Sequence, residues 1–116
     1  MQRRLLSVGT NLTLLKLRHK VFLDAGYEVL IARSGAAAIR AIEAGDLDAV
    51  VVGHSLTSRM KELIVGVAKR AQLPVVVLHA NLNEEPIAGA DANLYGIDGA
   101  ARIVEVLSDH LRSGDS

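Results

Sequence analysis

The sequence predicts a doubly wound α/β domain, in which helices cover both faces of a parallel β-sheet. The first observation is a run of four consecutive apolar residues, Ala49–Val52, that leads into Gly53-His54-Ser55. An unbroken β-branched run without alternation is typical of a strand buried on both faces. A second such run at residues 75–78, and the alternation of strand-like with helix-like segments along the chain, predict the same fold class.

The composition predicts one domain and argues against several classes of function. The chain has 116 residues, enough for one domain and too few for two, so we assign residues 1–116 to a single domain with a frayed tail at 113–116. The 13 basic and 13 acidic residues balance, which argues against nucleic acid or an anionic membrane as a partner. Cysteine is absent, and no apolar run approaches the roughly 20 residues that span a bilayer. We therefore expect a soluble, cytoplasmic protein.

Each element follows from local pattern and turn chemistry. Asparagine, threonine and serine residues are placed to cap helices, and Gly26 and Gly45 are placed to end them. The predicted strands are residues 5–8, 27–32, 49–52, 75–78 and a short one within 89–95. The predicted helices are residues 12–25 (capped by Thr10 or Asn11), 35–44 (capped by Ser34), a third from Thr57 or Ser58 to the break at Gln72-Leu73-Pro74, and a last one from Asp98 or Gly99 to about Arg112.

Two helix faces are predicted from spacing. For the third helix, the buried side is expected to consist of Met60, Leu63, Ile64, Val67 and Ala71. For the first helix, a basic face is expected to lie in solvent, although it could also dock an acidic partner. That face consists of Lys16, Arg18, His19 and Lys20.

The order of elements predicts the sheet topology. Strands that alternate with helices form right-handed β-α-β crossovers and hence a parallel sheet. Five strands in a chain of this size favour a flavodoxin-like sheet with the strand order 2-1-3-4-5. The segment from His79 to Gly89 contains Pro86 and has room for little more than one helical turn, so a fourth helix is expected to be short or missing.

Five phrases of the sequence, in order and at compatible spacing, resemble the receiver (CheY-like) domain of two-component response regulators over nearly the full chain. The phrases are Ala25-Gly26-Tyr27-Glu28-Val29, Ser34-Gly35 followed by Ala38-Ile39, Leu47-Asp48-Ala49-Val50-Val51-Val52, Pro74-Val75-Val76-Val77-Leu78, and Gly89-Ala90-Asp91. The resemblance implies the flavodoxin-like fold and a place in a signalling pathway. It also implies where an active site would lie, at the carboxyl ends of the strands.

The positions that carry chemistry in that family do not match it here. The acidic pair that holds Mg²⁺ falls on Gly9 and Thr10, and the phosphoaccepting aspartate falls on Gly53. Glycine has no nucleophile, and Mg²⁺ sites usually include one or two carboxylates. The other family positions fall on His79 (hydroxyl residue), Asn93 (aromatic switch residue), Gly96 (lysine) and Ile97 (proline). We therefore predict a degenerate pseudo-receiver with no phosphorylation site, catalytic residue, metal or cofactor.

A candidate ligand mouth remains at the same edge, formed by Thr10, Asn11, His54 and His79. The two histidines follow adjacent strands and could form a metal or acid–base pair, but the sequence offers no third ligand or orienting carboxylate. Small residues before a helix can bind an anion, yet no dinucleotide or P-loop motif is present. The simpler interpretation is a capped turn and two polar residues that fill the space beside the glycines.

Two functions follow from these observations. The first is a non-enzymatic, receiver-like domain of a two-component or phosphorelay-type pathway, which binds an unidentified protein partner and could also self-associate through an exposed sheet edge. The second is a small-anion or ligand sensor, or a minor enzyme, that uses the edge near Gly9, Gly53, His54 and His79. An open cavity there would favour the second function, whereas filling of the space by Leu56, Leu82 or Ile97 would exclude it.

Overall fold

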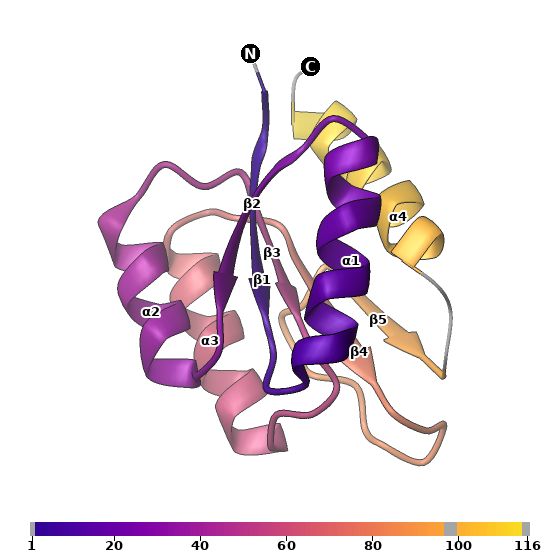
Figure 1. The fold of residues 1–116 in the computed structure, drawn as a ribbon. Helices are drawn as coiled ribbons and strands as arrows, with labels where there is room; N and C mark the ends of the chain where they lie inside the picture. Colours follow the sequence, from indigo (N-terminus) through magenta and orange to yellow (C-terminus); the bar gives the residue numbers. More distant parts are fainter. Residues whose placement is uncertain (1, 97–99, 115–116) are drawn as a thin grey trace.

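A five-stranded parallel sheet in the order β2-β1-β3-β4-β5 forms the centre of the protein (Figure 1). The structure is a computed structural model and describes residues 2–96 and 100–114. The strands are β1 (Arg4–Val8), β2 (Glu28–Ala32), β3 (Ala49–Val52), β4 (Val75–His79) and β5 (Ala92–Tyr95). The helices are α1 (Leu12–Asp24), α2 (Gly35–Ala44), α3 (Ser58–Arg70) and α4 (Ala100–Gly114). The predicted fold class and strand order are confirmed.

Helices cover both faces of the sheet, which explains the unbroken apolar runs in β3 and β4. α1 and α4 lie on one face, and α2 and α3 lie on the other (Figure 1). Alternate residues of β3 enter different cores: Val51 packs on the α1/α4 side, and Val50 and Val52 pack on the α2/α3 side. All four residues of β3 are fully buried, because neither face of this strand meets water.

Local capping sets where three of the helices begin. The side chains of Asn11, Ser34 and Thr57 each accept a hydrogen bond from the backbone N–H three residues later, at 3.1, 3.1 and 3.2 Å. Gly26 follows α1 with a φ of 93°, a left-handed conformation that favours glycine, as its position after the helix predicts. The choice between Thr10 and Asn11 as first cap is thereby decided in favour of Asn11.

The buried side of α3 differs from the predicted one. Its buried residues are Lys61, Ile64, Val65 and Ala68, a stripe at helical spacing. Leu63, expected inside, is 49% exposed, and Ala71 lies beyond the helix and is also exposed. The prediction is confirmed for Ile64, which is buried, and for Met60 and Val67, which are partly buried against the core. It was wrong for Leu63 and Ala71 because it assigned the inner face by apolarity alone, whereas the helix buries a lysine and leaves a leucine in solvent.

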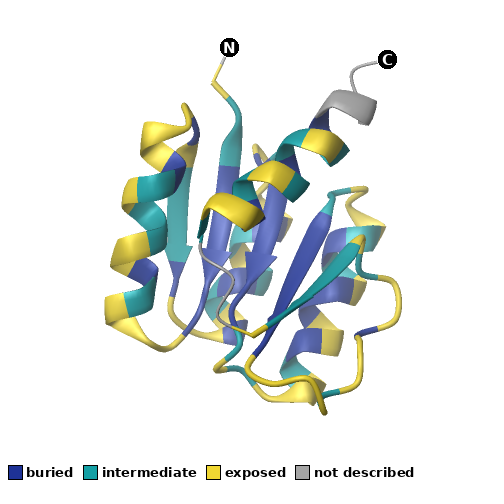
Figure 2. Cartoon of the chain, turned by 90° about the vertical axis from the view of Figure 1, so that its right-hand side faces the viewer, coloured by how far each residue is buried: buried dark blue, intermediate teal, exposed yellow. Residues whose placement is uncertain are grey.

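No helix lies between β4 and β5 in the described structure, and a chain of turns connects the two strands instead. The edge strands β2 and β5 are half-buried, in contrast to the fully buried β4 (Figure 2). The predicted start of the last helix at Asp98 or Gly99 lies outside the described residues, and α4 reaches Gly114, two residues beyond its predicted end. Its inward residues include Ile103, Leu107 and Leu111, as predicted.

The helices that the structure describes are α1 to α4. None of them is both long enough and apolar enough to cross a bilayer.

Candidate functional site at the carboxyl edge of the sheet

The first half of the carboxyl edge, where β1 and β3 end, is closed by backbone. The Gly53 N–H donates to the Val8 carbonyl at 2.7 Å, so the two strands stay paired past the last residue of β3. A Cβ added to Gly53 would lie 2.7 Å from the same carbonyl oxygen, closer than real Cβ atoms approach. The loops beyond are joined by a hydrogen bond from the Thr10 N–H to Ser55 Oγ at 3.1 Å. We refer to this region as the β1–β3 half of the edge.

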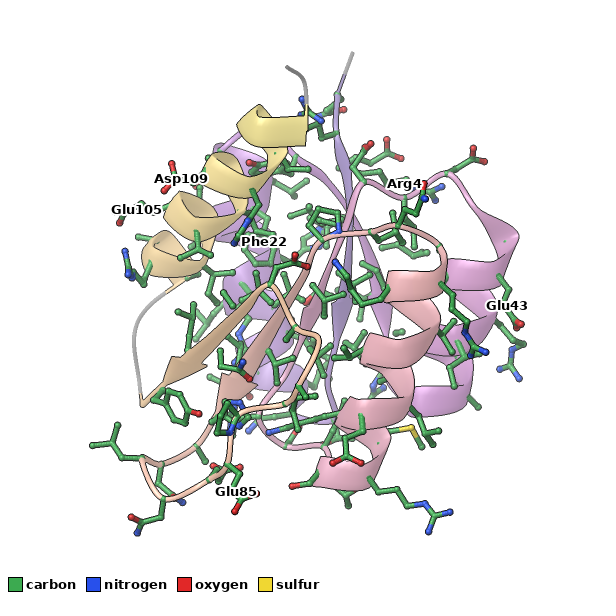
Figure 3. All side chains as sticks on the ribbon, turned by 180° about the vertical axis from the view of Figure 1, so that it is seen from behind. Arg4, Phe22, Glu43, Glu85, Glu105 and Asp109 are labelled. Carbon is green, nitrogen blue, oxygen red and sulfur yellow. The ribbon has the colours of Figure 1, made fainter. Side chains whose placement is uncertain are left out.

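The β1–β3 half does not fit a Mg²⁺ ion of the kind that the family resemblance implies. Gly9 and Gly53 carry no ligand atoms in side chains, and Thr10 offers a hydroxyl in place of a carboxylate. Among the described residues, no group of three or more histidine, aspartate or glutamate side chains is placed to hold a metal. Glu85, one of the acids that follow β4, is exposed and projects from the β4–β5 connection (Figure 3).

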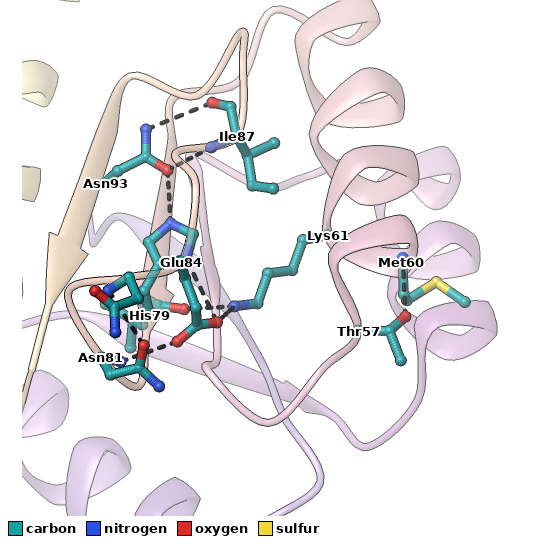
Figure 4. Close-up of polar contacts among 10 residues, drawn as sticks. Thr57, Met60, Lys61, His79, Asn81, Glu84, Ile87 and Asn93 are labelled. Atoms are coloured by element: carbon teal, nitrogen blue, oxygen red, sulfur yellow. Dashed lines mark hydrogen bonds and ion pairs between the residues drawn. The ribbon is translucent and has the colours of Figure 1, made fainter.

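The second half of the edge, where β4 and β5 end, is filled by polar side chains (Figure 4). His79, the last residue of β4, is 1% exposed. Its Nε2 lies 2.8 Å from Asn93 Oδ1, and because an amide oxygen only accepts hydrogen bonds, the ring nitrogen is the donor. Asn93 Oδ1 also accepts from the Ile87 N–H at 2.9 Å. The His79 ring stacks on Tyr95 with centroids 4.7 Å apart. We refer to this region as the β4–β5 half of the edge.

Lys61 enters the β4–β5 half from α3 and is 1% exposed. Its Nζ donates to the Leu78 carbonyl at 2.9 Å and lies 3.5 Å from Glu84 Oε1 (Figure 4). A buried ammonium group is unfavourable unless it is paired and hydrogen-bonded, and both conditions are met here. The sequence analysis missed this residue. The signal that could have found it is the 61-64-65-68 stripe of α3, which is apolar except for the lysine.

Glu84 links the lysine to the loop that follows β4. Its Oε2 accepts a hydrogen bond from the Asn81 N–H at 2.9 Å, and its Oε1 lies 3.9 Å from His79 Nδ1. The backbone hydrogen bond from Asn81, and the nearby Lys61 charge, hold the pKa of Glu84 below its ordinary value. Glu84 is therefore a carboxylate at neutral pH. His79 Nδ1 has no hydrogen-bond partner among the described residues.

A cavity of about 540 Å³ opens beside these residues, between α1, the carboxyl ends of β4 and β5, and the start of α4. Its apolar wall includes Leu14, Leu17, Val21, Leu78 and Leu94. Its polar lining consists of Arg18, Lys20, His54 and His79, with no carboxylate among the described lining residues. The volume lies within the roughly 300–1,000 Å³ range of small-molecule sites.

The structure separates the residues of the predicted ligand mouth. His54, His79 and Gly96 line the cavity, whereas Thr10 and Asn11 do not. Leu56 packs against the core on the α2/α3 side, and Leu82 is 83% exposed, so neither fills the cavity. Ile97 lies outside the described residues. As far as the described residues show, the edge is open near the histidines and closed near Gly9 and Gly53. Whether the histidines bind a ligand stays a prediction.

Arg18 was expected in solvent, and the structure places it at the site instead. Its guanidinium lies 3.3 Å from the position that a Cβ on Gly53 would take, and it lines the cavity. Partial burial lowers the pKa of Arg18. Burial, followed by the positive charges of Arg18 and Lys61, also lowers the pKa of His54, and the Glu84 charge opposes this shift. His54 is thereby favoured in its neutral form at pH 7.

The fold is that of the receiver domains of two-component signalling proteins, as structural comparison shows. The receiver domain of a putative LuxO repressor from Vibrio parahaemolyticus has a TM-score of 0.84 and 19% identity, with 99% of this chain and 94% of that chain covered. A CheY-like receiver domain protein from Methanospirillum hungatei has a TM-score of 0.83 and 18% identity, covering 99% and 98%.

A third similar structure is the receiver domain of a sensor histidine kinase from Pseudomonas aeruginosa, which holds a magnesium ion in its active-site cleft. It has a TM-score of 0.81 and 19% identity, with 96% of this chain and 98% of that chain covered. At the level of sequence, no protein-family model and no curated protein matches the chain.

Proposed function

We propose that this protein is a receiver-fold signalling domain that does not accept a phosphoryl group and acts by binding a protein partner. The observation that carries the proposal is the closure at Gly53, where the backbone of β1 occupies the space that an aspartate Cβ would need. Loss of the nucleophile alone could be repaired by one substitution. Here a side chain at position 53 would also have to displace the Val8 carbonyl, because its Cβ would lie 2.7 Å from that oxygen.

The replacement of the other family positions supports the same proposal. The positions of the hydroxyl residue and the aromatic switch residue are His79 and Asn93, which hydrogen-bond directly to each other. In place of a lysine after β5, the cation of the β4–β5 half comes from Lys61 on α3 and is paired with Glu84. Side chains that would respond to a phosphoryl group are thus committed to contacts with each other. We propose binding rather than catalysis as the activity, and a cytoplasmic location.

The phosphorylation half of the proposal is tested by intact-mass spectrometry after incubation with acetyl phosphate and MgCl₂. We expect no increase by the mass of a phosphoryl group, while a receiver domain with its acidic residues, treated in parallel, gains one. A stoichiometric, base-labile adduct on this chain would overturn the proposal.

The binding half is tested by affinity capture from cells of the source organism, with and without Mg²⁺ and beryllium fluoride. We expect the same partner in both samples, and we expect the purified pair to bind with equal affinity in both conditions. Partner binding that requires beryllium fluoride would contradict phosphate-independent signalling. The alternative interaction is self-association. Analytical ultracentrifugation of the purified domain would detect it as a mass greater than that of one chain.

A further inference from the structure

The cavity between α1, β4, β5 and α4 combines an apolar wall with an arginine, Arg18, that has no counter-charge among the described residues. Arg18 makes no hydrogen bond or ion pair with any other residue in the described part of the chain. An arginine that is partly removed from water loses hydration, and this loss is normally offset by a carboxylate, a phosphate or a carbonyl. The Arg18 guanidinium therefore has unused donors at the wall of the cavity.

The surroundings of Arg18 define which anion would fit. His54 lines the same cavity, and burial and the charges of Arg18 and Lys61 lower its pKa and favour its neutral form, in which one ring nitrogen can still donate. Lys20, the other cation of the lining, is exposed. Glu84, which also acts on His54, is paired with Lys61. One guanidinium and one neutral histidine match a single negative charge better than a double one.

The rest of the cavity defines the body of the ligand. The apolar lining comes from two elements of the fold: Leu14, Leu17 and Val21 belong to α1, and Leu78 and Leu94 belong to the sheet. Leu17 is 59% exposed although it lies on this wall, so binding of an apolar group would remove leucine surface from water. A ligand without an apolar part would leave this wall hydrated and would gain only the contact with Arg18.

We propose that this cavity binds an apolar monocarboxylate, with the carboxylate on Arg18 and His54 and the hydrocarbon body between the α1 leucines and the ends of β4 and β5. The planar guanidinium can donate two parallel hydrogen bonds to a carboxylate. The carboxylate then lies beside Gly53, on the side where a receiver carries its own acidic residue. The inference goes beyond the proposed function and does not depend on it.

The test is a titration of the ¹⁵N-labelled protein with octanoate at pH 7.5, followed by amide NMR. We expect saturable shifts at Arg18, His54, Leu78 and Leu94. We expect no shifts at Val67 and Arg70, which line a second, shallower groove on the opposite face. Octanol should bind at least roughly tenfold more weakly than octanoate, because it lacks the charge that Arg18 pairs with. Inorganic phosphate should give no saturable shift, because it lacks the apolar body.

Matched variants separate the charge from the apolar wall. Arg18→Gln should weaken octanoate binding by roughly tenfold and leave octanol unchanged, and Arg18→Lys should lose less. Arg40→Gln, which removes an exposed cation from α2 on the other face, should have no effect. Val21→Phe should fill the cavity and weaken both ligands. The amide spectrum of each variant establishes that it is folded.

The proposal is overturned if octanoate shifts map outside the cavity, if octanol binds as tightly as octanoate, or if Arg18→Gln and Arg40→Gln behave alike. Failure of the proposed function would instead be seen as a phosphoryl adduct in the mass measurement, which does not involve octanoate. The two ideas can therefore fail separately.

Discussion

The two halves of the carboxyl edge are built in different ways. In the β1–β3 half, Gly53 allows the backbone of neighbouring strands to close together, and no side chain fills the position. In the β4–β5 half, polar side chains occupy the space and hydrogen-bond or pair with one another. His79 and Lys61 are both almost fully buried there. The packing of the β1–β3 half requires that position 53 has no side chain, whereas the packing of the β4–β5 half requires several polar side chains.

The same edge of one sheet is therefore stabilised in two ways, by backbone in one half and by side chains in the other. In the β1–β3 half, the hydrogen bond from the Gly53 N–H to the Val8 carbonyl holds the strand ends together through main-chain atoms alone. The β4–β5 half is held together by a side-chain network of Lys61, Glu84, His79 and Asn93, in which each polar group depends on a partner. Substitutions should therefore be costly in both halves, but for steric reasons in one and for polar reasons in the other.

The largest effect is expected for Lys61→Ala in the β4–β5 half. The substitution removes a fully buried four-carbon stem and the donor to the Leu78 carbonyl, so we expect a loss of about 3 kcal/mol in the free energy of unfolding. Lys61→Met keeps the stem and should lose less. Urea denaturation measures both, with Lys16→Ala on exposed surface as the control, expected within about 0.5 kcal/mol of wild type. A Lys61→Ala protein as stable as this control would show that the network does not stabilise the fold.

The next effect is expected for Gly53→Ala in the β1–β3 half. The new methyl group would meet the Val8 carbonyl at 2.7 Å and force the strand ends apart, which should cost about 2 kcal/mol. Gly66→Ala is the matched control, because a Cβ there meets nothing within 4 Å on an exposed helix position. It should stabilise the protein by about 0.5–1 kcal/mol. Equal thermal shifts for the two variants would contradict the backbone closure.

A smaller effect is expected for Asn93→Leu, which breaks the β4–β5 half at its centre. The change leaves His79 Nε2 and the Ile87 N–H without their acceptor, and because Asn93 is half-buried we expect a loss of about 1.5 kcal/mol. Ring ¹⁵N chemical shifts of His79 should also change, since the tautomer is fixed by this hydrogen bond. Asn83→Leu, at an exposed position, serves as the control. An unchanged His79 spectrum would rule out this contact in solution.

The smallest expected effect is the pH dependence of stability that arises from His54, which follows β3 and senses the charge of Lys61 in the β4–β5 half. The pKa of His54 is lowered by burial and by Arg18 and Lys61, so the unfolded chain binds this proton more readily than the folded one. The stabilising contribution is present above the unfolded value of 6.5 and declines as the pH falls from there toward the lower folded pKa. It should be small, because His54 is only partly buried and solvent screens the nearby charges.

The measurement for this prediction is the difference in unfolding free energy between wild type and His54→Gln across pH 5.5–7.5, a window set by the ordinary histidine pKa. Glu84 stays ionised throughout, because its pKa lies below its usual 4.5. The wild-type curve should fall more steeply toward pH 5.5 than the variant curve. Parallel curves would show that His54 titrates alike in the folded and unfolded chains.

Much of the fold could be predicted from local pattern. β3 and α2 have the predicted bounds, because a buried β-branched run and a serine cap followed later by glycine are local signals. The missing helix between β4 and β5 was also predicted, from Pro86 and the shortness of the segment. The absence of carboxylates at Gly9 and Gly53 follows from the sequence once strand ends are assigned.

The alternation of elements, the strand order and the residues at each strand end could be predicted from the sequence, because they depend on periodicity, caps and chain connectivity. Only the tertiary structure decided that Lys61 is buried against Glu84 and that Arg18 lies beside Gly53 on an open cavity. The physical reason is that a polar side chain is buried when distant residues supply its partner or its walls. Helical spacing predicts which side of α3 carries Lys61 and which side of α1 carries Arg18. The contacts on those sides come from Glu84 in the β4–β5 connection and from Gly53 at the end of β3.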